Sequence, residues 1–103
     1  MYMSADQTAK LSQKISEQKN GICIVFSALD ADHDNAQNNN WHSFFVPKQL
    51  ITLKSGGHRF VLNNGSQYAW KYLYFSDTQI TGNDANRDTT PNDRFTLRYV
   101  IGL

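Results

Sequence analysis

The sequence predicts an antiparallel all-β domain, a β-sandwich or jelly-roll-like architecture, preceded by a short N-terminal helix. Three observations predict this fold class. Short apolar and β-branched runs alternate with polar segments from residue 22 onward. Asn64 and Gly65 stand between two such runs, and an Asn-Gly pair is the strongest short cue for a β-hairpin. The chain ends on a run from Arg94 to Gly102 in which side chains alternate as in a strand.

The first twenty residues differ in kind from the rest and predict the helix. Ser4 and Gln7 have the spacing of a capping box, and helix-forming residues follow to Lys19. Such a helix is too short and too polar to be stable alone, so it needs the β-domain or copies of itself as partner. We therefore expect a helical stem or linker over residues 1–20 and a β-domain over 21–103, with a frayed terminus as the alternative. About two heptads of a coiled coil are indicated by Thr8, Leu11, Ile15, Gln18 and Ile22.

Beyond residue 20 the pattern predicts strands joined by polar loops. Residues 30–40 contain three Asp and four Asn and no apolar side chain beyond two Ala, which predicts a solvated loop. Residues 81–94 predict a second polar loop, and Ser55, Gly56 and Gly57 predict a turn. Three runs predict strands: Ile22–Leu29, Trp41–Val46 and Gln49–Leu53.

The hairpin from His58 to Phe75 predicts two faces of different character. A two-residue turn at its centre would place Leu62 opposite Gln67. The face toward the core would then carry Phe60, Leu62, Ala69, Leu73 and Phe75. The opposite face would carry an arginine and a row of amphipathic rings: Arg59, Val61, Tyr68, Trp70, Tyr72 and Tyr74. In the last strand, alternation predicts one face with Phe95, Leu97, Tyr99 and Ile101.

Composition excludes several partners. Lys and Arg number 10 against 9 for Asp and Glu and are scattered, so no basic stripe is available for nucleic acid. The single Cys23 lies in an apolar run, which predicts a buried hydrophobe and no disulfide within the chain. No apolar stretch is long enough to span a bilayer, and the N-terminus has no signal-peptide core. We therefore expect no membrane partner. Assembly in a bacterial cytoplasm, followed by release in a particle, fits these features.

Metal binding and catalysis find little support in the residue pattern. Asp30, Asp32 and Asp34 resemble the start of a calcium loop but lack its later glycine and glutamate, so a solvated acidic loop is expected. The three histidines lack metal-ligand spacing. Glu17 is the only glutamate, and no phosphate loop or nucleophile elbow occurs. We predict no catalytic residue, no metal and no cofactor. A glycosidase would have to pair aspartates from Asp77, Asp84, Asp88 and Asp93.

The remaining side chains suit saccharide binding. Sugar C–H faces stack on aromatic rings, and sugar hydroxyls need planar polar partners. For each aromatic residue the alternative role is packing in the core or between subunits, and for the polar loops it is an ordinary solvated turn. The rings available are Trp41, Tyr68, Trp70, Tyr72 and Tyr74. The polar side chains available are Asn38, Asn39, Asn40, Asn83, Asp84, Asn86, Arg87 and Asp88.

Four strings, from residue 20 to the end of the chain, carry a resemblance to a known family: NGICIVFSA, NNNWHSFFVPK, KYLYFSDTQITGNDAN and FTLRYVIGL. In this order they resemble the C-terminal head of receptor-binding tail proteins from siphophages of Gram-positive hosts such as Streptococcus thermophilus. The segment before the last strand departs from the family pattern, because Arg87 to Arg94 is shorter and more charged than in many relatives. No site in that loop is therefore carried over.

The resemblance implies a trimeric β-domain of a phage virion that binds cell-wall or surface polysaccharide. It also implies contacts with other tail or baseplate proteins through the N-terminal side. A homotrimer has crevices between subunits where loops converge, and we place the saccharide site there. The predicted site residues are Trp41, His42, Trp70, Asn83, Asp84 and Asn86. Two alternatives are a structural module that trimerises and caps a fibre without touching the receptor, and an enzyme that trims wall sugars.

Overall fold

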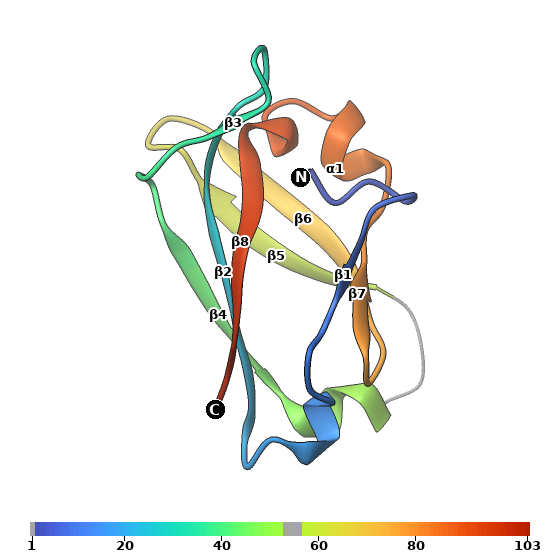
Figure 1. The fold of residues 1–103 in the computed structure, drawn as a ribbon. Coiled ribbons are helices and arrows are strands. Elements are labelled where there is room, and N and C mark those ends of the chain that lie inside the picture. The colour runs from blue at the N-terminus through green and yellow to red at the C-terminus, as the bar shows by residue number, and fades with distance from the viewer. Residues whose placement is uncertain (1, 53–56) are drawn as a thin grey trace.

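The computed structural model describes residues 2–52 and 57–103, and it forms two antiparallel β-sheets (Figure 1). The strands are β1 (Thr8–Lys10), β2 (Gly21–Asp30), β3 (Asn35–Ala36), β4 (His42–Pro47), β5 (His58–Asn63), β6 (Tyr68–Phe75), β7 (Gln79–Thr81) and β8 (Phe95–Gly102). One sheet, here the hairpin sheet, has the order β1-β7-β6-β5. In the other, the β2 sheet, β2 pairs with β3, β4 and β8. The prediction of an antiparallel all-β fold is confirmed.

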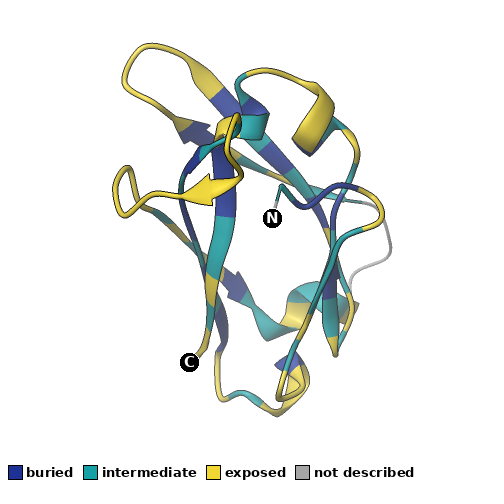
Figure 2. Ribbon diagram, turned by 45° about the horizontal axis from the view of Figure 1, so that its top comes forward, coloured by how far each residue is buried: buried dark blue, intermediate teal, exposed yellow. Residues whose placement is uncertain are grey.

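The core lies between the two sheets. Alternate side chains of β2 point inward, so Ile24 and Phe26 are fully buried. From the hairpin sheet, Leu62, Leu73 and Ile80 enter the same cluster. Figure 2 shows the buried residues along the strands and the exposed ones mainly in the connections. The described residues also form short helical segments: η1 (Ile15–Glu17), η2 (Lys48–Thr52), α1 (Ala85–Asp88) and η3 (Asn92–Arg94).

The predicted helix from Ser4 to Lys19 is wrong, and the segment instead joins the β-domain. Gln7 does bond the Ser4 amide, with 3.1 Å between Gln7 Oε1 and Ser4 N, but this closes a single turn. β1 then pairs with β7, and Ile15 is fully buried in the core. A short polar helix has little stability of its own, so strand pairing and the burial of Ile15 prevail. The heptad pattern therefore gives no support for a coiled-coil stem.

The hairpin of β5 and β6 forms as predicted, but its register is shifted by two residues. Leu62 pairs with Ala69 and not with Gln67, because the loop is longer than a two-residue turn. Asn64 stabilises this loop by accepting a hydrogen bond from the Gln67 amide at 2.8 Å. A shift of two keeps the alternation of side chains, so both predicted faces of the hairpin are preserved.

A β-bulge in β8 reverses which of its side chains face the core. The pairing with β2 slips by one residue at Arg98. Phe95 is buried, but beyond the bulge Val100 packs inward while Tyr99 and Ile101 are about half exposed. The prediction that Phe95, Leu97, Tyr99 and Ile101 share one face is therefore wrong beyond the bulge, where the alternation is reversed.

Two predictions about the segments between strands are also wrong. The expected strand Gln49–Leu53 is replaced by η2. Leu53, the last residue of that expected strand, lies outside the described residues, as do Ser55 and Gly56 of the expected turn. A short apolar run does not distinguish a strand from a helical turn by periodicity alone. Residues 81–94, expected to be a loop, contain α1 and η3.

Truncating Ile15 tests whether the N-terminal segment is part of the folded domain. We expect Ile15→Ala to lower the free energy of unfolding by about 2–5 kcal/mol, because it leaves a cavity in the core. The exposed Lys19→Ala on the same segment should change it by less than about 0.5 kcal/mol. Urea denaturation measures both, and equal stability of the two variants would contradict the integral role of this segment.

Candidate functional site

A groove of about 300 Å³ lies on the outer face of the hairpin sheet. Its floor is the row of aromatic side chains on β6, since alternate residues of a strand face the same side. β5 contributes one arginine, and the segment leading into α1 forms the opposite wall. The lining residues are Arg59, Trp70, Tyr72, Tyr74, Asn83 and Ala85.

Arg59 lies over the aromatic floor of the groove. Its guanidinium carbon is 4.5 Å from the centre of the Trp70 ring and 5.9 Å from that of Tyr72. The ring quadrupole attracts a cation in this position, by about 0.5–1 kcal/mol at an exposed site. None of the carboxylates in the described part of the chain forms an ion pair with Arg59. The stacking therefore orients a guanidinium whose charge is not neutralised by any described carboxylate.

Asn83 forms the polar rim of the groove opposite Arg59. Its amide nitrogen donates to the Tyr74 hydroxyl at 3.3 Å. Its amide oxygen accepts from the backbone N–H of Ala85 at 2.9 Å, which starts the turn into α1. One side chain thus connects the last ring of the aromatic row to the neighbouring wall.

Two buried asparagines hold that wall against β6. β7 pairs only with the end of β6, at Tyr74 and Phe75, and leaves the rest of this edge to other partners. Asn86 Oδ1 accepts from the Tyr72 amide at 2.7 Å, and its Nδ2 donates to the Tyr72 carbonyl at 2.9 Å. Asn92 Oδ1 accepts from the Trp70 amide at 2.8 Å. The two side chains therefore take the place of a neighbouring strand beside the groove.

Lys71 lies beneath the groove on the opposite face of β6 and is fully buried. Its Nζ donates to the carbonyl oxygens of Tyr2 at 2.9 Å and Asn86 at 3.2 Å. Burial lowers the pKa of this ammonium group from 10.5 to about 7, and the charge of Asp93 partly opposes the shift. Lys71 thereby connects the N-terminal segment, β6 and α1 from inside.

The structure brings together only part of the predicted site. Trp70 and Asn83 line the groove. Asp84 is next to it, but its carboxylate accepts from the Ala5 amide at 3.0 Å and pairs with Arg87 at 3.5 Å. Asn86 is fully buried, so it supports the groove and cannot contact a ligand from solvent.

Trp41 and His42 lie away from the groove. His42 accepts a hydrogen bond from the Asn63 amide at 3.1 Å, and its ring packs edge-on against Phe95 at 5.5 Å between centroids. Trp41 stacks on Tyr99 at 6.1 Å between centroids. The groove residues missing from the predicted site are Arg59, Tyr72, Tyr74 and Ala85. The alternation along the hairpin had placed the first three on its outer face.

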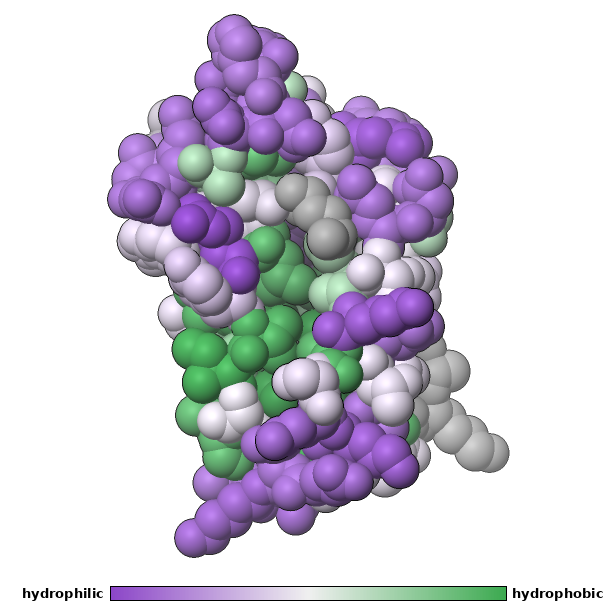
Figure 3. Space-filling model, viewed as in Figure 1, coloured by the Kyte–Doolittle hydropathy of each residue, from purple (hydrophilic) through white to green (hydrophobic). Residues whose placement is uncertain are grey.

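Trp41 belongs to an apolar outer face of the β2 sheet. Arg98 lies 5.0 Å from the Trp41 ring centre and donates to Asn38 Oδ1 at 3.0 Å, which ties this ring to the loop before β4. Phe45 is 55% exposed on the same sheet. Figure 3 shows hydrophobic side chains gathered around β8 and its neighbours on this side of the molecule. We call the exposed residues Trp41, Phe45, Tyr99 and Ile101 the apolar face.

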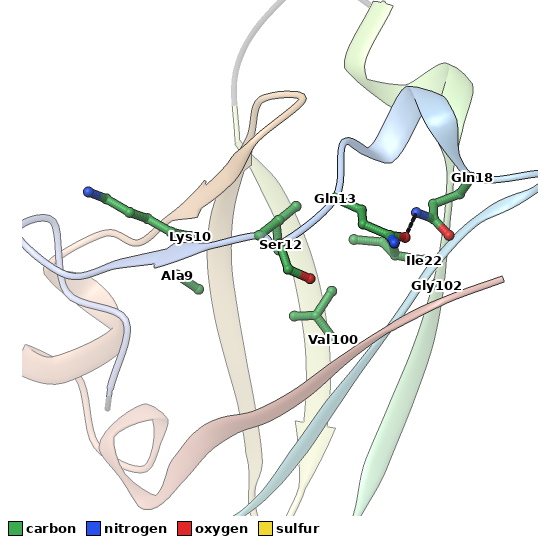
Figure 4. A pocket seen from close by; sticks show the side chains of 9 residues that line it. Ala9, Lys10, Ser12, Gln13, Gln18, Ile22, Val100 and Gly102 are labelled. Atoms are coloured by element: carbon green, nitrogen blue, oxygen red, sulfur yellow. Dashed lines mark hydrogen bonds between the residues drawn. The ribbon is translucent and has the colours of Figure 1, made fainter.

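A second cavity, of about 310 Å³, lies where β1 of one sheet approaches β8 of the other. Figure 4 shows Val100 directed into it and the Gln13 and Gln18 amides, joined by a hydrogen bond of 3.0 Å, at one end. It contains no aromatic ring among its lining residues, and two of its polar side chains, Gln13 and Gln18, already bond each other. This cavity therefore offers less to a planar or saccharide ligand than the groove.

The described residues contain no helix long and apolar enough to cross a membrane. Among those same residues, no group of three or more His, Cys, Asp or Glu side chains could hold a metal ion. At the expected acidic loop, Asp30 instead accepts from the Asp32 amide at 3.2 Å and bonds the His33 ring at 2.8 Å. The Asp30 carboxylate thus stabilises the turn that follows β2.

Comparison of the chain with protein-family models, with curated proteins and with solved structures found no match. The likeness to phage receptor-binding heads therefore rests on the sequence strings given above.

The buried Lys71 makes stability depend on pH. In the folded protein its pKa is about 7, against 10.5 for the ordinary side chain, so between these values unfolding takes up a proton. We expect the free energy of unfolding to rise with pH across this interval, by up to about 1.4 kcal/mol per pH unit. Below pH 7 both states hold the proton, and this contribution becomes constant.

Urea denaturation between pH 6 and pH 10 measures this slope. The comparison is with Lys71→Met, which keeps the length and apolar stem of the side chain and should have the smaller slope. Parallel curves for the two proteins would show that Lys71 does not titrate in this interval.

Proposed function

We propose that this domain is the receptor-binding head of a bacteriophage tail protein, which attaches the virion to saccharides of a Gram-positive cell wall. The observation that carries the proposal is the groove, where Trp70, Tyr72 and Tyr74 form a row beside the polar groups of Asn83 and Arg59. Rings of this kind stack on the C–H faces of sugars, and the amide and guanidinium groups bond hydroxyls. The resemblance of the sequence strings supplies the class of protein.

Binding without catalysis is the proposed activity. Among the described residues, the groove is lined by one charged side chain, Arg59, and by no carboxylate that could serve as acid, base or nucleophile. An open groove that desolvates few polar groups binds weakly, on the order of micromolar to millimolar. Several heads on one virion compensate through avidity, because the first contact raises the effective concentration for the next.

The apolar face supports the proposal that the head is a homotrimer. Phe45 on β4 and Tyr99 and Ile101 on β8 are about half exposed, and these two strands flank β2 in one sheet. Contiguous apolar surface is uncommon on monomeric proteins and marks contact sites. We assign this face to contacts between copies of the chain, and the N-terminal side to other tail or baseplate proteins. Saccharide would then bind on the hairpin sheet, away from the subunit contact.

A structural module that trimerises and caps a fibre is the second candidate. The apolar face favours it as much as it favours a trimeric receptor-binding head. The two differ at the groove, since a capping module needs no exposed aromatic row.

Truncating one groove ring tests the saccharide site. We expect Tyr74→Ala to weaken binding of host wall oligosaccharides by about tenfold, because it removes a stacking surface and the partner of Asn83. Isothermal titration gives the affinity, and adsorption of the phage to host cells gives the biological effect. Tyr68→Ala is the matched control, because Tyr68 is on the same face of β6, is 76% exposed and does not line the groove. Undiminished adsorption by Tyr74→Ala would favour the capping module.

A charge on the apolar face tests self-association. We expect light scattering of the wild-type domain to give the mass of a trimer. Phe45→Lys should shift the measured mass toward that of a monomer, because the lysine would be desolvated at the contact. Val61→Lys serves as the control, since Val61 is 56% exposed on the other sheet. A monomeric wild-type domain would argue against the trimer.

A further inference from the structure

We propose that the groove selects a saccharide that carries an anionic group, a phosphodiester or a carboxylate, and that Arg59 binds this group. The inference rests on the proposed saccharide-binding function and names the class of sugar. Two observations support it: the groove carries a positive charge, and its arginine stacks on aromatic rings without an ion-pair partner among the described residues.

Arg59 differs from the other three arginines of the chain, all of which the structure describes. Arg87 bonds Asp88, with 2.7 Å between Nε and Oδ1, and Arg94 pairs with Asp93 at 3.7 Å. Arg98 donates to Ser27 and to the loop before β4. These three have partners within the domain. Arg59 has aromatic rings below it and no hydrogen-bond or ion-pair partner among the described side chains.

The stacking of Arg59 suits it to an oxyanion. The guanidinium carbon lies over the Trp70 ring, 4.5 Å from its centre. The N–H donors of a guanidinium lie in the plane of the group, and a ring does not use them as a carboxylate would. Two parallel donors match two oxygens of a phosphate or carboxylate, and such charge-assisted pairs are about twice as strong as neutral hydrogen bonds. Because the ring also fixes the side chain, less conformational entropy is lost when the anion binds.

No described residue of the groove competes with an anionic ligand for Arg59. The other side chains that line the groove, in the part of the chain that the structure describes, are uncharged, and the Asp84 carboxylate beside it is directed to Arg87 and the Ala5 amide. The lysine of β6, Lys71, is fully buried and cannot reach a ligand. An anionic group adjoining a sugar ring would thus meet Arg59 while the ring stacks on the aromatic row.

Wall glycan fragments from Streptococcus thermophilus, separated by anion exchange into neutral and acidic pools, test the inference by isothermal titration. We expect the acidic pool to bind at least tenfold more tightly than the neutral pool. Arg59→Gln should remove this preference, and Arg59→Lys should keep part of it. Lys14→Gln removes the same charge from a residue that does not line the groove and should bind like the wild type.

Two treatments of the acidic pool identify the source of the charge. Hydrofluoric acid cleaves phosphodiesters, whereas carbodiimide activation followed by borohydride converts carboxylates to alcohols. Binding lost after one treatment assigns the anion to that group.

Each other outcome has a separate meaning. Equal binding of both pools, weakened by Tyr74→Ala but not by Arg59→Gln, would overturn the anionic specificity and leave the proposed function intact. Failure of the wild-type domain to bind either pool would refute the saccharide-binding function itself, and the inference with it.

Discussion

The groove depends on the hydrogen bonds that asparagine side chains make to the open edge of β6. β7 covers only the last residues of that edge, so the amides of Trp70 and Tyr72 need other acceptors. Asn92 and Asn86 provide them at 2.8 and 2.7 Å. An unpaired amide at a buried edge would cost about 1–3 kcal/mol, so these two side chains determine where the α1 segment lies. The position of that segment in turn creates the second wall of the groove.

The same connection extends through the sheet to the N-terminus. Asn86 Nδ2 also donates to the Met3 carbonyl at 2.6 Å, and Lys71 Nζ joins the Asn86 and Tyr2 carbonyls. An ammonium group without a salt-bridging carboxylate is costly to bury, and its lowered pKa reflects that cost. The aromatic row and the buried lysine are therefore neighbours on one strand, with opposite environments on its two faces.

The two outer faces of the domain have different chemistry. The hairpin sheet presents rings that each keep a polar edge, together with an arginine and an amide. The β2 sheet presents Phe45, Tyr99 and Ile101, which have fewer polar groups to offer. Surfaces of the first kind suit a hydrated ligand such as a sugar, and surfaces of the second kind suit contact with another protein. This division is the basis for placing receptor and subunit contacts on opposite sheets.

The sequence by itself determined the all-β class, β2, the hairpin and the two faces of that hairpin, because alternation along a strand is local and survives a register shift of two. It did not determine the structure of the N-terminal segment. There a helix-capping signal at Ser4 and Gln7 competes with strand pairing to β7, which lies about seventy residues further along the chain. Nor did it reveal the bulge at Arg98, which exposes Tyr99. Only the tertiary structure separated Trp41 from Trp70 and buried Asn86, because the distance between side chains on different sheets is decided by packing and not by sequence pattern.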